Sequence, residues 1–427
     1  MGAAEVAGGA GHGHGDRDVA VITPWYPTRQ VPFGGAFVRA MVEATAPVWT
    51  RATVYHVDGW GARVSVPQDE AILRASPGLV TRTTGAATTV AGAELRYVAA
   101  PARVGISFAQ LARRHSDALR TALGGQKIGA SVVHGHVGLR GGWTALENAR
   151  PGARVFVTEH ASFLRSVLEQ PDSRAMYDEV IRRATGFFAV GESVRSVLVE
   201  TFPHHADRIT IMPNPISFGP AREHPVADLR RWLYVGVLKE PKGVGLLLEA
   251  FARCRAEDPS LTLTFVGEGA LRGPLGLRVA ELGVADAVTF AGWAEHDRAL
   301  ELMRQHDLLV HPSRSETFGM VVVEAISAGA PVLVTRCGGP EVTLAGIEDA
   351  AGALMDVTDD PGTIVDAYRA LRDRFPSQVD VAHARTVLED RYGYDAIGQA
   401  YARAWFPDVV DAGSAADSRH AASSPLE

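Results

Sequence analysis

Two carboxylates stand eight residues apart in the stretch HPSRSETFGMVVVEAISAGAPVLVTRCGGPE, residues 311–341. Glu316 lies in a polar loop after the apolar run DLLVHP, and Glu324 lies in an apolar helical pattern that begins near Gly319. A helix N-terminus offers free N–H groups to a phosphate, and a glycine there lets a ligand approach the backbone. A carboxylate on an apolar helix needs a partner, and a pair of ribose hydroxyls is suitable. A structural role remains open for each: an acid at a helix N-terminus for Glu316, an internal hydrogen-bonding group for Glu324.

Other side chains suited to an anionic ligand follow predicted strands. Gly34 and Gly35, in FGGAF, stand where a larger side chain would block a phosphate, although a plain tight turn also explains the pair. Lys242, in EPKGVG, supplies a point charge for a diphosphate unless it is an ordinary surface lysine. His160 ends the strand pattern RVFVTEH, and ligands of parallel α/β sheets bind beyond the carboxyl ends of strands. A structural histidine is the alternative.

The segment HGH at 134–136 is a weak candidate for a metal site. His134 and His136 flank one glycine on a predicted strand, and no carboxylate ligand stands nearby in the sequence. We therefore expect no metal ion. The glycine spacing of GEGALR does not match the dinucleotide fingerprint G-x-G-x-x-G.

The composition is that of an ordinary globular protein. The chain has 427 residues, 46% hydrophobic and 21% charged, with a formal net charge of −7, which argues against a nucleic-acid partner. No uncharged apolar run reaches transmembrane length, and no strongly basic amphipathic helix stands in 60–95, so we expect at most weak peripheral membrane contact. Two cysteines give no disulfide framework, which favours the cytoplasm. The excess of arginine over lysine indicates a GC-rich bacterial genome.

Short β-branched runs alternate with helical patterns in both halves of the chain, which predicts two doubly wound α/β domains. A proline-rich stretch near 213–230 marks the hinge between them. The predicted organisation is a disordered tail at 1–16, a first domain at 17–213, a second domain at 214–393, a terminal helix at 394–407 and a disordered tail at 408–427. The predicted strands are 19–23, 52–57, 95–99, 131–136, 154–159 and 186–190, then 232–236, 261–267, 287–292, 307–312 and 331–335. A helix is predicted over 139–149, and in the terminal helix Ile397, Tyr401 and Trp405 recur at four-residue spacing, which predicts one buried face.

These residues stand in an ordered set of motifs that resembles glycosyltransferase family 4, a family of retaining enzymes with the GT-B fold. Its signature is a Glu, seven residues and a second Glu, with TFG after the first, and the similarity continues through EAISAGAPVLVTRCGGPEV. Further similar motifs are TPWYPTRQVPFGGAFVRA, VFVTEHASF, FFAVGESVRSVL, IMPNPI, YVGVLKEPKGVGLLLEAF and FVGEGALR. The resemblance covers about residues 19–406. It implies two Rossmann-like domains that face each other across a cleft, with the C-terminal helix crossing back onto the first.

The resemblance implies the retaining transfer of a hexosyl group from a UDP- or GDP-sugar to an acceptor hydroxyl. The nucleotide sugar is then a co-substrate, and neither cofactor nor metal is expected. The residues that it implies for catalysis are His160, Glu316 and Lys242; for donor binding they are Gly34, Gly35, Lys242, Gly267, Trp293, Glu316, Phe318, Gly319, Met320, Val321 and Glu324; and His136 borders the acceptor pocket. In these roles Glu316 contacts the hydroxyls of the donor sugar, and Glu324 binds the ribose.

One position departs from the family pattern. Gly236-Val237-Leu238 stands where the family usually has Gly-Arg-Leu, which leaves Lys239 and Arg314 as candidates for the missing positive charge. Two other functions stay open: a nucleotide-sugar epimerase of the same fold, and a catalytically impaired nucleotide-binding subunit. The expected acceptor is a small molecule or saccharide of secondary-metabolite or cell-surface glycan biosynthesis.

Overall fold

The computed structural model describes residues 17–28, 34–60, 87–89, 91–101 and 105–408. The predicted disordered tail at 1–16 lies outside the described residues, as does the tail at 408–427 apart from its first residue. Most of the segment 60–95 also lies outside them.

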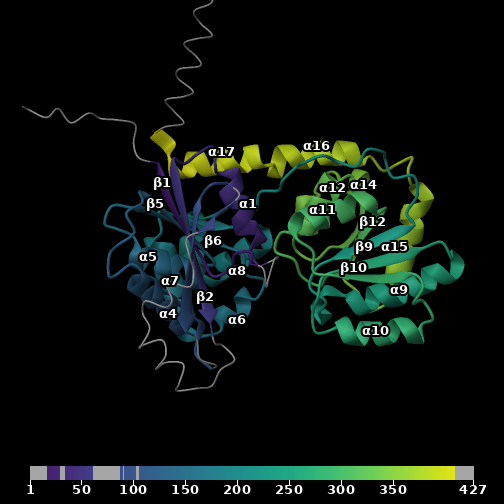
Figure 1. Cartoon of the computed structure of the whole chain (residues 1–427), viewed down its shortest axis with the longest axis horizontal. Helices are drawn as coiled ribbons and strands as arrows, with labels where there is room; N and C mark the ends of the chain where they lie inside the picture. Colours follow the sequence, from purple (N-terminus) through teal and green to yellow (C-terminus); the bar gives the residue numbers. More distant parts are fainter. Residues whose placement is uncertain (1–16, 29–33, 61–86, 90, 102–104, 409–427) are drawn as a thin grey trace, which may run out of the picture.

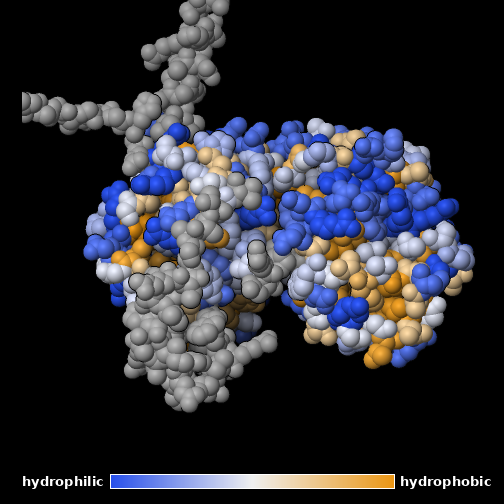
Figure 2. All heavy atoms as spheres, viewed as in Figure 1, coloured by the Kyte–Doolittle hydropathy of each residue, from blue (hydrophilic) through white to orange (hydrophobic). Residues whose placement is uncertain are grey.

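The described residues form two lobes (Figures 1 and 2), and each lobe is built on its own β-sheet (Figure 1). The first sheet has eight strands in the order β3-β4-β2-β1-β5-β6-β7-β8, all paired in parallel except β3 with β4. Its strands are β1 (Asp18–Thr23), β2 (Arg51–Trp60), β3 (Ala87–Thr88), β4 (Glu94–Pro101), β5 (Val132–His136), β6 (Arg154–Glu159), β7 (Gly186–Ala189) and β8 (Ile209–Ile211).

Helices connect these strands and cover both faces of the first sheet. They are α1 (Ala36–Ala44), α4 (Phe108–Ala122), α5 (Thr144–Asn148), α6 (Leu164–Leu168), α7 (Pro171–Arg183) and α8 (Glu192–Thr201), with a π-helix, η1 (Gly138–Trp143), and a 3₁₀ helix, η2 (Pro203–Arg208). The sequence pattern predicted one helix over 139–149. The chain instead winds as η1 and then as α5, because the turn after β5 is unusually tight, as described below.

The second sheet has six parallel strands in the order β11-β10-β9-β12-β13-β14. Its strands are β9 (Arg231–Val235), β10 (Thr262–Val266), β11 (Val288–Gly292), β12 (Leu308–His311), β13 (Val332–Thr335) and β14 (Gly352–Met355). Its helices are α9 (Val244–Glu257), α10 (Arg272–Glu281), α11 (His296–Gln305), α12 (Met320–Ser327), α13 (Pro340–Thr343), α14 (Glu348–Ala351), α15 (Pro361–Arg374) and α16 (Val381–Tyr392), with a 3₁₀ turn, η3 (Glu240–Lys242).

Both sheets are buried on both faces, which explains the nearly continuous apolar runs of their strands. In β9, Trp232 and Tyr234 pack into one hydrophobic cluster, and Leu233 and Val235 pack into another on the opposite face. Alternate side chains of a strand point to opposite faces, so two helical layers sandwich each sheet. The predicted fold, two doubly wound α/β domains, is confirmed.

The last helix, α17 (Tyr394–Trp405), leaves the second lobe and packs on the first, where it lies along α1 (Figure 1). Ile397, Tyr401 and Trp405 join the hydrophobic core of the first domain. At Gly398 a Cβ atom would lie 2.3 Å from the carbonyl oxygen of Ala44, so a glycine is needed where the two helices meet. The predicted crossing of the C-terminal helix onto the first domain is therefore present.

A second connection runs beside the first. The segment between β8 and β9 is bonded to the end of α16, because the backbone N–H of Ile216 donates to the carbonyl of Tyr392 at 2.8 Å. The two domains are thus joined by two connecting segments that lie side by side.

Among the helices of the described residues, none combines the length and the apolarity needed to span a bilayer.

Candidate active site

The loop between β12 and α12 carries a compact polar cluster. His311 ends β12, and its Nε2 lies 2.8 Å from the carboxylate of Glu316, which also accepts a hydrogen bond from the Lys242 ammonium. The ring of Tyr234 stacks on His311 with centroids 5.4 Å apart. The backbone N–H of Glu316 donates to the carbonyl of Cys337 at 3.1 Å, which fixes the loop from the other side. Residues at or after the ends of β9, β12 and β13 therefore surround the carboxylate of Glu316.

The cluster keeps Glu316 ionised. Burial by itself would raise the pKa of Glu316, but the hydrogen bond and charge of His311, together with Lys242, lower it to about 2. Both partners are largely shielded from water, since the side chains of Lys242 and Glu316 are 20% and 16% exposed. Before any ligand binds, the positive charge of Lys242 is thus held at the loop by a carboxylate.

This pairing predicts a dependence of stability on pH. Because the pKa of Glu316 lies below its ordinary 4.5 in the folded chain, ionised Glu316 stabilises the fold above that pH, and the contribution is lost between about 4.5 and about 2. We expect Glu316→Gln to lower the free energy of unfolding by up to about 3 kcal/mol at neutral pH, and the deficit to shrink as the pH falls. Denaturant titrations across this pH range measure the deficit. The exposed Glu281→Gln serves as the control, and a deficit that is constant with pH would contradict the prediction.

Helix α12 begins directly after this loop. Gly319 caps it with φ of 83°, a left-handed conformation that favours glycine, and Phe318 is buried against Tyr392 with ring centroids 5.1 Å apart. The first turn carries no acidic side chain, and Glu316 in the preceding loop is already paired with Lys242 and His311, so the backbone N–H groups at Met320 and Val321 keep their partial positive charge. An anion is the ligand that this end of the helix favours.

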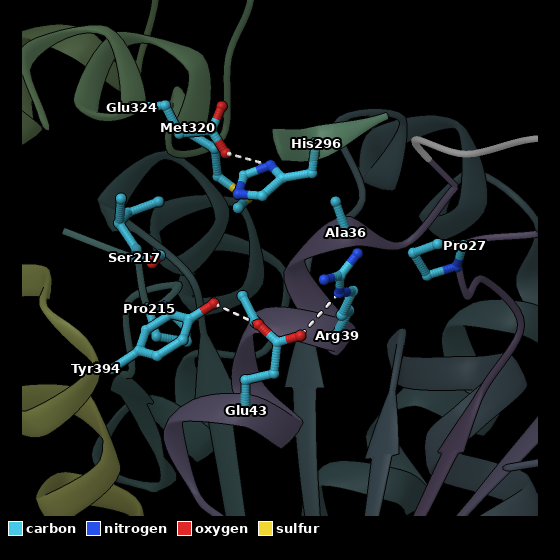
Figure 3. Close-up of a pocket in the computed structure, with 12 residues that line it drawn as sticks. Pro27, Ala36, Arg39, Glu43, Pro215, Ser217, His296, Met320, Glu324 and Tyr394 are labelled. Carbon is cyan, nitrogen blue, oxygen red and sulfur yellow. Dashed lines mark hydrogen bonds and ion pairs between the residues drawn. The ribbon is translucent and has the colours of Figure 1, made fainter. Parts of the chain in front are cut away.

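Glu324, one turn further along α12, faces the space between the two domains (Figure 3). Its carboxylate lies 3.7 Å from Nδ1 of His296 at the start of α11. Burial raises the pKa of Glu324, and the charge of His296 opposes that shift. Glu324 has no closer partner among the described residues, which leaves its oxygens available to hydroxyl donors.

Residues from both domains line the pocket of about 360 Å³ into which Glu324 points, and the pocket is open to solvent. On the side of α1, Glu43 accepts a hydrogen bond from Arg39 at 2.7 Å and one from Tyr394 at 2.8 Å (Figure 3). Because Tyr394 begins the crossover helix, three elements meet there: α1, α12 and α17. This is one of the described pockets between the domains, and a second lies between residues 190–192 of the first domain and Thr317 and Phe318 of the second.

His160 ends β6 on the side of the first domain. It is 8% exposed, stacks on Phe37 of α1 with ring centroids 4.1 Å apart, and shares a hydrogen bond of 2.9 Å with His136 through its Nε2. Burial, and then the neighbouring His136, lower the pKa of His160 well below its ordinary value. His160 is therefore neutral at physiological pH and a weak base, and it is better suited to hydrogen bonding than to proton abstraction.

The backbone around His160 is fixed by the carboxylate of Glu159. One oxygen accepts from the N–H groups of His160 and Ala161, at 2.7 and 2.6 Å, and the other accepts from the N–H of Gly138 at 2.7 Å and from the hydroxyl of Tyr177. Four donors on one buried carboxylate leave it no capacity for another strong partner.

His136 lies behind His160. It is fully buried, burial lowers its pKa to about 3, and its ring stacks on that of His134 at 4.7 Å. His134 in turn bonds Thr158 at 2.7 Å and accepts from Trp405 of α17 at 3.2 Å. A direct contact between His136 and an acceptor would need a rearrangement, so any effect of His136 on the acceptor passes through His160.

The remaining predicted positions are spread over strand-end loops of both domains. A Cβ at Gly35 would lie 2.1 Å from the carbonyl oxygen of Trp25, so the tight turn alone requires a glycine there, and Gly34 adjoins it in the same turn. Gly267 follows β10 with φ of 135°, and Trp293 follows β11 with 41% of its surface exposed.

The usual arginine position holds an exposed valine. Val237 is 40% exposed, and it lies in the loop after β9 with the exposed Lys239. Arg314 pairs with Asp359, a strongly exposed residue. Of the two candidates for the missing charge, Lys239 has no ion pair among the described residues.

The residues that the sequence singled out thus gather in two groups. Lys242, Glu316 and the start of α12 lie on the second domain, and His160 lies on the first. The domains touch directly beside the first group, where the Ser193 hydroxyl of α8 donates to the carbonyl of Thr317 at 3.3 Å. Sequence reasoning missed His311 and His296. The position of His311 at the end of a buried strand is the same signal that identified His160, whereas nothing in the sequence singled out His296.

Among the described residues, one group of three side chains could hold a metal ion, and it lies away from the candidate active site. Asp178, His204 and His205 could each offer a ligand atom, and they lie on α7 and η2, elements that carry none of the residues above. His134 uses both ring nitrogens in the hydrogen bonds described above, whereas His136 uses Nδ1 and its Nε2 is buried without a partner.

Two protein-family models match the chain, one over each lobe. The model described as Glycosyltransferase Family 4 matches residues 78–218, and the model described as Glycosyl transferases group 1 matches residues 222–377. The interval between the two matches falls in the segment that joins the lobes.

Known proteins resemble both lobes. The chain is 29% identical over 247 residues to a glycogen synthase of Mycobacterium tuberculosis, covering 55% of this chain and 59% of that enzyme. It is 28% identical over 358 residues to D-inositol 3-phosphate glycosyltransferase 2 of Catenulispora acidiphila, covering 75% of this chain and 82% of that enzyme. The structure of Anabaena HepE in complex with UDP-glucose superposes with a TM-score of 0.62 at 18% identity, covering 90% of this chain and 98% of that one. The match thus spans about three fifths of the glycogen synthase, and the structural likeness shows a shared GT-B fold.

Proposed function

Since the chain belongs to glycosyltransferase family 4, we propose that it transfers a hexosyl group from a UDP- or GDP-sugar to an acceptor hydroxyl, with retention of anomeric configuration. The observation that carries this proposal is the cluster of Lys242, Glu316 and His311 beside the N-terminus of α12. Two relatives bear glycosyltransferase or synthase names, and HepE was solved with UDP-glucose, which supports a nucleotide-sugar donor.

In the proposed complex the donor diphosphate lies at the N-terminus of α12. Lys242 then shares its charge between Glu316 and the diphosphate, while the N–H groups of Phe318 to Val321 face the phosphate and the sugar. Glu316, kept ionised by its neighbours, orients hydroxyls of the sugar. The loops at Gly267 and Trp293 surround the base, and Gly34 and Gly35 bring the backbone of the first domain close to the phosphates.

Glu324 is proposed to bind the ribose. Its carboxylate is buried, faces the cleft and has Nδ1 of His296 at 3.7 Å. Burial disfavours the ionised form of Glu324 in the ligand-free chain. Two ribose hydroxyls would donate hydrogen bonds to the ionised carboxylate and offset that cost.

Transfer is proposed to occur on one face of the sugar. The acceptor oxygen bonds to the anomeric carbon as the bond from that carbon to the phosphate oxygen breaks, and the acceptor proton passes to the departing phosphate. No general base is needed, in keeping with the low pKa of His160, which hydrogen-bonds the transferred sugar from the first domain. Charge stabilisation by Lys242 and the helix N–H groups supplies the catalysis.

A donor screen tests the proposal. Thermal unfolding is measured with UDP-, GDP- and dTDP-sugars, and a UDP- or GDP-sugar is expected to raise the melting temperature more than the free sugar does. Products are then analysed with and without a mixture of hydroxyl acceptors. Conversion of the donor sugar without an acceptor would favour the epimerase, and absence of any nucleotide effect would favour an impaired subunit.

Two substitutions separate the proposed roles. Glu324→Gln is expected to raise the KM for the donor by about 10-fold or more with a small change in kcat, because it removes a ground-state contact to ribose. His160→Ala is expected to lower kcat by about 100-fold with little change in the donor KM, because its contact forms at the transferred sugar. Steady-state kinetics measure both, and a reversal of the two patterns would contradict the assignment.

The acceptor is proposed to be a small molecule or saccharide, in secondary-metabolite or cell-surface glycan biosynthesis. The carboxyl ends of the first-domain strands are where it would bind, because His160 and the transferred sugar lie at that edge.

A further inference from the structure

Arg140 is a charged side chain near this edge that the proposed mechanism does not use. It lies in η1, and its guanidinium carbon lies 4.6 Å from the ring centroid of Trp25. Its guanidinium forms no hydrogen bond or ion pair with any residue that the structure describes. The side chain is half-buried, and a guanidinium that loses part of its hydration without gaining an anionic partner is costly, so its presence calls for a reason.

The neighbouring carboxylates do not supply that partner. Burial lowers the pKa of Arg140 to about 10, although the charges of Glu159 and Asp58 oppose the shift. Glu159 is already occupied by four donors, as described above. Asp58 is half-buried and lies within 3.5 Å of the Tyr97 hydroxyl. Arg140 therefore remains a cation at neutral pH, without a bonded carboxylate.

Other basic groups gather near Arg140. Both ring nitrogens of His115 on α4 are buried and without a partner, and burial, followed by the charges of Arg140 and His56, lowers the pKa of His115 to about 3. His56 stands near the end of β2 and is itself buried. Because burial lowers the pKa of both histidines, they are uncharged at neutral pH and Arg140 is the positive charge at this point, while His115 offers an unpaired ring N–H.

The backbone that presents Arg140 is strained. Val137 has φ of 69°, which is rare for a β-branched residue, and it leads into the π-helix. A Cβ at Gly141 would lie 2.0 Å from the carbonyl oxygen of His136, so the turn closes tightly on the strand end. Single π-turns occur mainly at functional sites, and this one places Arg140 at the edge where substrates bind.

Aromatic rings link Arg140 to His160. Trp25 meets Phe37 edge to face with ring centroids 6.2 Å apart, and Phe37 stacks on His160. On its other side Trp25 contacts Phe163 at 6.2 Å, and Phe163 is 38% exposed. A small acceptor lying over these rings would present one end to Arg140 and another to the sugar beside His160.

We propose that Arg140 and Trp25 form an acceptor subsite for an anionic group, so that the acceptor carries a phosphate or carboxylate besides the hydroxyl that is glycosylated. The proposal rests on the glycosyltransferase function proposed above and names its acceptor class. A planar guanidinium binds either anion through two parallel N–H···O bonds, while the ring of Trp25 holds it in place.

A binding experiment tests the subsite. The full chain, saturated with UDP to fill the diphosphate site, is titrated by calorimetry with inorganic phosphate or acetate, against chloride of equal ionic strength. We expect Arg140→Met to weaken the binding of at least one of the two anions by about 10- to 100-fold, and Arg140→Lys to weaken it less. Arg120→Met, at an exposed ion pair on α4, is the control and should leave binding unchanged. Equal anion binding in wild type and Arg140→Met, or none in wild type, would overturn the subsite and leave Arg140 as a packing partner of Trp25.

Acceptor pairs extend the test to turnover. Polyols are offered with and without a phosphate or carboxylate, and we expect Arg140→Met to raise the KM of the anionic member about 10-fold or more, without changing the donor KM. Transfer only to neutral acceptors would overturn the proposal. The difference in anion binding between wild type and Arg140→Met requires no sugar transfer, so failure of the subsite can be told apart from failure of the glycosyltransferase function. Melting curves of each variant show that the fold is retained.

Discussion

Lys242→Met is expected to lower kcat by about 100- to 1,000-fold, the usual cost of losing a group that stabilises charge on a leaving group. In the ligand-free chain Lys242 is held by Glu316, and in the proposed complex its charge also faces the diphosphate. Charge on the diphosphate grows as the bond to the sugar breaks, so the lysine contributes more in the transition state than in the ground state. Single-turnover measurements at saturating donor isolate this step.

Lys239→Met is the matched control, because Lys239 is an exposed lysine three residues earlier in the same connection. If Lys239 has taken over the charge of the arginine that Val237 replaces, its substitution should mainly raise the donor KM. A larger loss of kcat at Lys239 than at Lys242 would contradict the role given to Lys242.

Trp405→Ala is expected to lower the free energy of unfolding of the first domain by about 3–5 kcal/mol, the usual range for a large buried aromatic side chain. Trp405 is fully buried in the core of the first domain, and its indole N–H donates to His134. The substitution leaves a cavity and also an unpaired buried histidine nitrogen. Denaturant unfolding followed by fluorescence measures the loss, with the exposed Leu277→Ala as control.

Truncation before Tyr394 removes the whole crossover helix and should harm activity more than loss of residues 1–16. The helix contributes Ile397, Tyr401 and Trp405 to the first domain, and Tyr394 bonds Glu43 in the cleft. Full activity and unchanged stability in the truncated chain would show that the crossover is dispensable.

Much of the fold follows from local patterns. The apolar runs of the central strands predict buried parallel sheets, because a strand covered on both faces has no polar side; β1, β9, β12 and β13 fit this pattern. The terminal helix was predicted from its apolar face of Ile397, Tyr401 and Trp405, and these side chains are buried as that face requires.

Other elements gave weaker signals. Helices α15 and α16 and the short strand β14 were not identified, although Asp360 and Asp380 cap the two helices and both are ordinary N-cap residues. Their sequences are rich in charge and alanine, and α16 in particular has little amphipathic contrast. The π-helix was predicted as an α-helix, because close approach of Gly141 to a neighbouring strand is a tertiary constraint that no local pattern contains.

The sequence predicted where the site residues lie in the fold better than it predicted which of them bond to each other. The placement of Glu316 and Lys242 at strand-end loops of the second domain follows from the α/β rhythm, yet their mutual hydrogen bond joins residues 74 apart in sequence. The partnership of His136 with His160 likewise requires the register between β5 and β6. Sequence alone therefore identified candidate residues and left their pairing open.

The anomeric configuration of the product tests the central proposal most directly. The chain is incubated with a UDP- or GDP-α-hexose, labelled with ¹³C at the anomeric carbon, and with a mixture of hydroxyl-bearing acceptors, and the label is followed by NMR. We predict that the labelled carbon appears in a new α-glycoside together with free nucleoside diphosphate, and only when an acceptor is present. A β-glycoside as the first product, or conversion of the labelled sugar without any acceptor, would contradict retaining transfer.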